Sequence, residues 1–158
     1  MIKVIAVGKI KEPYLTDAIA EYCKRLSPYT RLEMYQVPDE KCPENLSDAL
    51  KAQVTEKEGR QILGHIGAKD YVISLEIKGK RMTSEGFASH MEMLRSAGRS
   101  EIAFVIGGSL GLSGEVSERA DLKLSFSDMT FPHQLMRVIL LEQIYRSFKI
   151  ARHEPYHK

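Results

Sequence analysis

Apolar runs alternate with segments of helical spacing from one end of the chain to the other. Five short runs, most of them rich in β-branched residues, are typical of buried strands. Between them, apolar residues recur every three or four positions, which indicates helices that pack one face against a sheet. The expected strands cover Ile2–Val7, Leu32–Val37, Tyr71–Ile77, Glu101–Ile106 and Leu122–Phe126.

Capping and stop signals bound the expected helices. Ser47 is a suitable N-cap, and the pair Ser27-Pro28 is a suitable stop for the first helix. Gly79 is expected to turn the chain after the third strand, and Gly98 to end the third helix. The expected helices cover residues 18–26, from Ser47 to about His65, from Ser84 to Gly98, Glu115–Ala120, and from about Pro132 to Ile150.

Strand–helix alternation with nearly continuous apolar strands predicts the α/β class, with a mostly parallel sheet covered by helices on both faces. The 158 residues fit one domain spanning 1–158, without an internal repeat or linker. Ligands of such sheets bind beyond the carboxyl ends of the strands. The loops after Leu75, Ile106 and Phe126 are therefore the first places to expect a site.

The last helix is more apolar than one buried face requires. Leu141, Ile144, Tyr145 and Phe148 form a stripe at helical spacing, and further apolar residues widen it. One explanation is deep burial within the monomer, and the other is packing against a partner subunit as well as the sheet. The residues that widen the stripe are Met136, Val138, Ile139 and Leu140.

Composition and charge exclude several classes. Lys and Arg number 23 against 21 Asp and Glu, and a net charge of +2 is too small for binding polyanions by bulk charge. Two cysteines, Cys23 and Cys42, are too few for a disulfide-stapled secreted scaffold. The apolar start is too short for a signal peptide, and the charge-free stretch Ile102–Gly114 is too short for a membrane span. A soluble, cytoplasmic protein with no membrane partner is expected.

The small net charge is unevenly distributed. Residues 129–158 carry a net charge of +3, whereas the rest of the chain carries −1. Arg146, Lys149 and Arg152 can share a helix face, either to complement the helix dipole or to bind an anion. Tyr156, which is followed by a histidine and a lysine, suits base stacking and phosphate contact, unless the tail is simply frayed.

Two segments beside the expected strand ends could form a ligand site. Gly107–Gly114 follows a strand and precedes a helix, but its spacing excludes a P-loop and gives no dinucleotide fingerprint. It serves either as a turn or as backbone that approaches a ligand closely. In Ser125–Gln134, Ser127 or Thr130 could cap the last helix and Phe131 could pack on the sheet. Alternatively, backbone groups of this segment hold an adenine or a carboxylate.

Neither a metal site nor a cysteine nucleophile is indicated. His153 and His157 have a spacing that would suit a metal on a helix, but Pro155 between them breaks the helix. No cluster of cysteines or carboxylates completes a ligand set, so no metal is expected. Neither cysteine has a directing partner nearby in the sequence.

The Gly107–Gly114 and Ser125–Gln134 segments resemble those of the SPOUT methyltransferases. The C-terminal part of these enzymes forms a deep trefoil knot that binds S-adenosylmethionine. More narrowly, the chain is similar to the RlmH (YbeA-like) group, which methylates N3 of a pseudouridine in helix 69 of 23S rRNA. The similarity spans nearly the whole chain and rests chiefly on Ile106–Ser109, Leu124–Gln134, Arg137-Val138 and Pro155–Lys158. Ile2–Lys9, Val37–Glu40 and Glu56–Gly59 extend it.

The resemblance implies a homodimer with a knot over about 100–150. It also implies that the cofactor lies in the knot, at the strand-end loops named above. Relatives often carry a polar residue where this chain has Leu110, so no side-chain contact is expected there. The cofactor-binding residues implied are Leu75, Gly107, Gly108, Phe126, Ser127, Asp128, Met129, Thr130 and Phe131.

The expected reaction needs little more than positioning and loss of one proton. His133, Tyr156 and His157 are the candidate catalytic residues, with His133 or His157 as proton acceptor, and the tail acts on the partner subunit's cofactor. Arg137, Arg152 and Lys158 would bind RNA phosphates. The expected partner is 23S rRNA within the large subunit or the 70S ribosome. The alternatives are a SPOUT enzyme acting on another RNA base and a non-catalytic RNA- or nucleotide-binding module.

Overall fold

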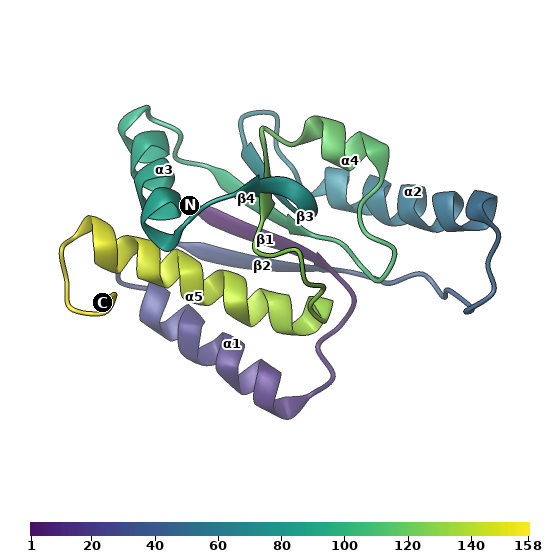
Figure 1. The fold of residues 1–158 in the computed structure, drawn as a ribbon, viewed down its shortest axis with the longest axis horizontal. Helices are drawn as coiled ribbons and strands as arrows, with labels where there is room; N and C mark the ends of the chain where they lie inside the picture. The colour runs from purple at the N-terminus through teal and green to yellow at the C-terminus, as the bar shows by residue number, and fades with distance from the viewer.

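The computed structural model describes residues 1–158 as five strands and five helices in alternation (Figure 1). The predicted strand–helix order is confirmed. The strands are β1 (Ile2–Val7), β2 (Leu32–Val37), β3 (Tyr71–Arg81), β4 (Ile102–Ile106) and β5 (Leu122–Ser125). The helices are α1 (Pro13–Leu26), α2 (Asp48–Gly64), α3 (Ser84–Ser96), α4 (Gly114–Arg119) and α5 (His133–Ala151).

The five strands form one sheet in the order β2-β1-β4-β3-β5, and every neighbouring pair is parallel. All carboxyl ends therefore meet at one edge of the sheet, as the apolar strand patterns predicted. β1 and β4 are buried along almost their whole length because helices cover both faces. The α/β fold class with a mostly parallel sheet is confirmed.

Helices α1, α3 and α5 cover one face of the sheet, and α2 and α4 cover the other (Figure 1). On the first face α5 lies between α3 and α1, and its Leu140, Leu141 and Ile144 are fully buried. A smaller core on the second face includes Ile62 of α2 and Val116 of α4. No helix of the chain combines the length and the apolar character needed to cross a membrane.

Gly79 does not turn the chain after β3, contrary to the prediction. The strand continues to Arg81 and pairs again with β5 after an irregularity between Leu75 and Lys80. A Cβ at Gly79 would lie 2.7 Å from the backbone carbonyl carbon of Lys123. This glycine therefore allows two strands to approach closely, which is another common use of the residue.

The expected side-chain cap of the last helix is also absent. Pro132 occupies the N-cap position of α5, where no side chain caps the helix. The Ser127 hydroxyl instead accepts a hydrogen bond from the Met129 backbone N–H, at 3.0 Å. Phe131 is 37% exposed and is not buried against the sheet. The hydroxyls of this segment shape the loop before α5 rather than the helix start.

Helix α5 is only partly covered within one chain. Val138, Ile139 and Met136 are half-buried, and Leu135 is 37% exposed. Tyr14 at the start of α1 is 68% exposed, and a hydrogen bond of 3.4 Å from the Lys11 N–H to the Gln134 side-chain oxygen joins the two regions. Burial within the monomer therefore does not account for the whole apolar arc of this helix.

Candidate active site

A cavity of about 690 Å³ lies at the carboxyl ends of β3, β4 and β5. This volume falls within the range of small-molecule sites. The wall comes from all three loops selected by the parallel-sheet argument, together with the first turn of α5. The lining residues are Leu75, Glu76, Ile77, Lys78, Ile106, Gly107, Gly108, Ser109, Leu110, Gly111, Leu112, Leu124, Phe126, Met129, Thr130, Phe131, His133 and Met136.

The glycine loop after β4 has no room for a side chain at Gly107 and little room for one at Gly108. A Cβ at Gly107 would lie 2.8 Å from the backbone of Gly111, and one at Gly108 would lie 3.1 Å from Val7 Cγ1. Gly111 itself adopts φ +80°, a left-handed conformation that favours glycine. The loop therefore forms this side of the cavity largely with its backbone, which can offer N–H and C=O groups to a ligand.

Seven of the nine residues predicted to bind the cofactor line this cavity. They are Leu75, Gly107, Gly108, Phe126, Met129, Thr130 and Phe131. Ser127 and Asp128 are not among the lining residues: Ser127 fixes the loop through the Met129 N–H, and Asp128 pairs with Arg81 on the surface. Of the predicted catalytic residues, only His133 belongs to the wall.

The sequence interpretation missed several wall residues from β3. Glu76, Ile77 and Lys78 lie in the wall, and the Glu76 carboxylate accepts hydrogen bonds from Ser74 Oγ at 2.6 Å and Ser117 Oγ at 3.1 Å. The available signal was their position directly after Leu75 at a strand end. Leu110, where no side-chain contact was expected, also lines the cavity.

His133 has an electrostatic environment that disfavours its charged form. Burial lowers the pKa of the His133 imidazole, and the neighbouring Arg137 guanidinium lowers it further. Asp39, which follows β2, opposes these effects. The ring is therefore neutral at neutral pH, and a neutral imidazole keeps one nitrogen able to accept a proton.

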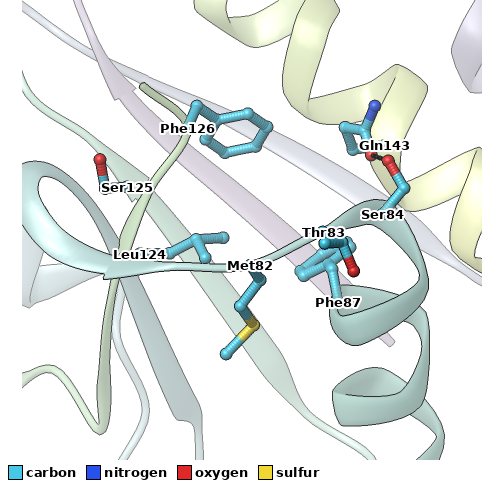
Figure 2. Close-up of a pocket in the computed structure, with 8 residues that line it drawn as sticks. All are labelled: Met82, Thr83, Ser84, Phe87, Leu124, Ser125, Phe126 and Gln143. Atoms are coloured by element: carbon cyan, nitrogen blue, oxygen red, sulfur yellow. Dashed lines mark hydrogen bonds between the residues drawn. The ribbon is translucent and has the colours of Figure 1, made fainter. Parts of the chain in front are cut away.

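A smaller pocket of about 150 Å³ adjoins the cavity and shares Leu124 and Phe126 with it (Figure 2). It lies between the end of β3, the start of α3, β5 and α5. Figure 2 shows Ser84 and Gln143 side by side at one edge of it, joined by a hydrogen bond of 2.8 Å from the Ser84 hydroxyl to the Gln143 side-chain oxygen. This polar pair borders a pocket otherwise lined largely by apolar side chains.

The C-terminal tail lies on the surface of its own chain, outside both pockets. His153 has φ +53°, and the chain after it folds back onto α5. The Tyr156 ring meets that of Tyr145 edge-on, with centroids 5.0 Å apart, and the Arg146 guanidinium lies 4.7 Å from the Tyr156 ring centroid. The Tyr156 hydroxyl donates to Glu142 Oε1 at 3.1 Å.

Both ring nitrogens of His157 are engaged in this docked position. His157 Nε2 lies 2.8 Å from Glu85 Oε1, and His157 Nδ1 lies 3.1 Å from Arg146 Nη1. Because a guanidinium only donates, Nδ1 accepts from Arg146 and Nε2 donates to Glu85. In this position His157 has no free nitrogen to accept another proton.

The three predicted phosphate-binding residues differ in exposure. Arg152 and Lys158 are exposed, and the Arg152 guanidinium lies 4.5 Å from the centroid of the Tyr29 ring. Arg137, in contrast, is 1% exposed and donates two hydrogen bonds of 2.6 Å, to the Val7 and Gly8 carbonyl oxygens. Its guanidinium is held inside the protein, so we correct its predicted role from phosphate contact to anchoring the end of β1.

A protein-family match covers nearly the whole chain. The family described as "Predicted SPOUT methyltransferase" matches residues 1–157. The chain belongs to the SPOUT methyltransferase family. The cavity therefore lies in a member of a methyltransferase family, at the strand-end loops where the resemblance located the cofactor.

Three relatives match this SPOUT chain over 157 residues, which is 99% of each chain. One from Carboxydothermus hydrogenoformans is 60% identical, and one from Bacillus thuringiensis subsp. konkukian is 57% identical; both are named "Ribosomal RNA large subunit methyltransferase H". A third, from Methanococcus maripaludis, is 59% identical and is named "Putative ribosomal RNA large subunit methyltransferase H".

Solved structures share the fold at low sequence identity. A putative methylase family protein from Neisseria gonorrhoeae has a TM-score of 0.54 at 13% identity, over 91% of this chain and 81% of that one. The TrmH/SpoU tRNA modifying enzyme of A. aeolicus has a TM-score of 0.52 at 16% identity, over 99% of this chain and 81% of that one. At these identities the likeness concerns the fold alone.

The cavity fits the chemistry of S-adenosylmethionine, the methyl donor implied by the resemblance. An adenine ring needs apolar walls for its faces and polar backbone groups for its edge. Leu75, Phe126 and Met136 offer apolar surface, and the Gly107–Gly111 loop supplies backbone that no side chain covers. The Glu76 carboxylate is the acidic group of this wall, and an anionic group suits a cationic sulfonium.

Proposed function

We propose that this protein transfers a methyl group from S-adenosylmethionine to N3 of a pseudouridine in helix 69 of 23S rRNA. The single observation that carries the proposal is the cavity at the carboxyl ends of β3, β4 and β5 in a SPOUT chain. Relatives of 57–60% identity over the full length, named as methyltransferases of large-subunit rRNA, support the substrate class. The pseudouridine and its position come from the resemblance described above.

The chain's own residues would hold the cofactor without a covalent bond to it. Leu75, Phe126 and Met129 would enclose the adenosine, and the backbone of Gly107 and Gly108 would approach it closely. The bound cofactor supplies a methyl group that is already electrophilic because it is attached to a sulfonium. The protein therefore has to align the two reactants, exclude water and remove one proton.

His133 is the better placed of the two candidate proton acceptors. It lines the cavity and is held neutral by burial and by Arg137, whereas both nitrogens of His157 are engaged with other side chains. A neutral imidazole in the cavity wall can take the proton that N3 loses as it gains the methyl group. In this proposal His133 is the catalytic base.

The enzyme acts as a homodimer in which the tail of one subunit approaches the cofactor site of the other. The half-buried apolar face of α5 and the exposed Leu135 and Tyr14 support a partner on this side of the molecule. Tyr156 and His157 do not line the cavity of their own chain, so a contribution to catalysis has to come across the dimer.

Recognition of RNA in this proposal relies on a few exposed cations. Arg152 and Lys158 contact phosphates, and Tyr156 is the aromatic partner of the same tail. A folded surface such as the assembled 70S ribosome suits these few cations better than a short sequence does. Such a substrate places the enzyme in the cytoplasm.

Transfer of tritium from methyl-labelled S-adenosylmethionine tests the proposal. Ribosomes lacking the modification, isolated large subunits and free 23S rRNA are offered in parallel, and we expect label on 23S rRNA with 70S ribosomes as the best substrate. His133→Asn serves as the comparison enzyme and is expected to lower transfer at least about a hundredfold. Cofactor binding without transfer to any of the three RNAs would refute the enzyme assignment.

A further inference from the structure

Arg137 is a buried cation without an acidic partner. It is the largest of the fully buried side chains, and only carbonyl oxygens accept from its guanidinium. Its Nε is buried and has no hydrogen-bond partner. An arginine stays charged inside a protein, and burying an uncompensated charge is costly. The unpaired charge of Arg137 therefore acts on any titratable group that lies nearby.

The nearest functional group is His133. The two residues are four positions apart on α5, so they share one face of the helix. They also converge on the same backbone position at the end of β1: a Cβ at Gly8 would lie 3.3 Å from His133 Nε2 and 3.8 Å from Arg137 Nη2. His133 lines the cavity whereas Arg137 does not, so the cation lies behind the imidazole rather than in the site.

Charges at this edge of the sheet act on the pKa of His133 in opposite directions. Asp39 favours the protonated imidazole, and burial together with Arg137 outweighs it, so that the pKa of His133 is lowered. Further carboxylates near this edge are Glu58 of α2, Glu76 of β3 and Glu40, which pairs with Lys57 at 2.9 Å. Glu58 accepts a hydrogen bond from the Glu40 N–H at 3.0 Å, and burial raises the pKa of Glu58. This weakens Glu58 as a counter-charge to His133.

We propose that Arg137 is a positioning residue that keeps the His133 imidazole uncharged and ready to accept a proton. The inference rests on the proposed function above. His133 takes the proton of N3, and the N3 electron pair forms the bond to the methyl carbon. The bond between that carbon and sulfur breaks, and its electron pair stays on sulfur. Arg137 touches none of these atoms and acts only through His133.

The pH dependence of methyl transfer tests this role with a matched pair of variants. Arg137→Gln removes the charge, whereas Arg137→Lys keeps it on a shorter side chain. We expect Gln to move the acidic limb of the kcat/KM profile upward by about one pH unit, and Lys to leave it within a few tenths of the wild-type position. A purely structural role would lower the melting temperature of both variants without moving that limb. An unmoved limb in Arg137→Gln would overturn the proposal.

A second measurement remains informative if Arg137→Gln does not fold or if the enzyme methylates nothing. The His133 imidazole of the wild-type protein is titrated by NMR and assigned by comparison with His133→Asn. We expect a pKa below the ordinary histidine value of about 6.5. Titration at or above that value contradicts the role of Arg137, whereas failure of methyl transfer alone contradicts only the proposed function.

Discussion

Gly107 and Gly108 shape the cavity because they have no side chains. Position 107 lies against the backbone of Gly111, and position 108 lies against the side chain of Val7. Backbone cannot move aside as a flexible side chain can, so position 107 is the stricter of the two. The sequence left open whether this segment is a turn or backbone that approaches a ligand, and only the packing shows that positions 107 and 108 lie close to Gly111 and Val7.

Gly107→Ala is therefore expected to weaken binding of S-adenosylmethionine at least about tenfold, because a clash at 2.8 Å has to displace the Gly111 turn. Gly114→Ala is the matched control, since nothing lies within 4 Å of a Cβ there. Calorimetric titration with the cofactor measures both. Equal affinities for the two variants would show that the loop does not form the binding site.

Glu58 gives a test of buried charge. Burial raises the pKa of its carboxyl group, so the free energy of unfolding should fall as pH rises from about 4.5 through the folded pKa. Glu58→Gln keeps an oxygen for the Glu40 N–H and removes the charge, so its melting temperature at pH 7 should exceed that of the wild type. The advantage should shrink toward pH 4. Glu118→Gln on the surface is the control, and a lower melting temperature for Glu58→Gln at pH 7 would contradict this reasoning.

The contacts of Arg137 and of the C-terminal tail could not be predicted from the local sequence. An arginine on a helix near a basic C-terminus has the pattern of a surface phosphate contact. Its actual partners are the Val7 and Gly8 carbonyls, about 130 positions away in sequence. The tail is similar, because Glu85 and Arg146 fix His157 through contacts that no local pattern encodes.

At the scale of elements, the alternating apolar pattern was sufficient to predict all five strands and their order along the chain. Buried strands and amphipathic helices have different periods, and both are visible in one sequence. The length of β3 could not be predicted, since Gly79 carries the same local signal in a turn and in a close strand pair. The three site loops could be predicted because all parallel strands end at one edge.

Gly79→Ala should lower the free energy of unfolding by about 1–3 kcal/mol, because the new methyl group would push β3 away from the Lys123 backbone. Gly64→Ala, at the end of α2, meets nothing within 4 Å and is the control. Chemical denaturation followed by circular dichroism measures both. If Gly79→Ala is as stable as the wild type, the close pairing of β3 with β5 is wrong.

At the scale of the whole molecule, the partly exposed α5 face predicts self-association. Leu135→Asp should shift a dimer toward monomer in sedimentation at micromolar concentration, because it places a charge in an apolar interface. Leu50→Asp is the control: Leu50 is 46% exposed on α2, which covers the opposite face of the sheet. A wild-type protein that sediments as a monomer would contradict the shared site.

The proposed substrate of the enzyme is N3 of one pseudouridine in helix 69 of 23S rRNA. The most direct test treats 70S ribosomes lacking the modification with the protein and S-adenosylmethionine, and then maps the new methyl group by mass spectrometry of nuclease fragments. We expect one added methyl group, on N3 of a pseudouridine in the helix 69 fragment, and at least about a hundredfold less of it with His133→Asn. A methyl group on another base, or unmodified rRNA despite bound cofactor, would contradict it.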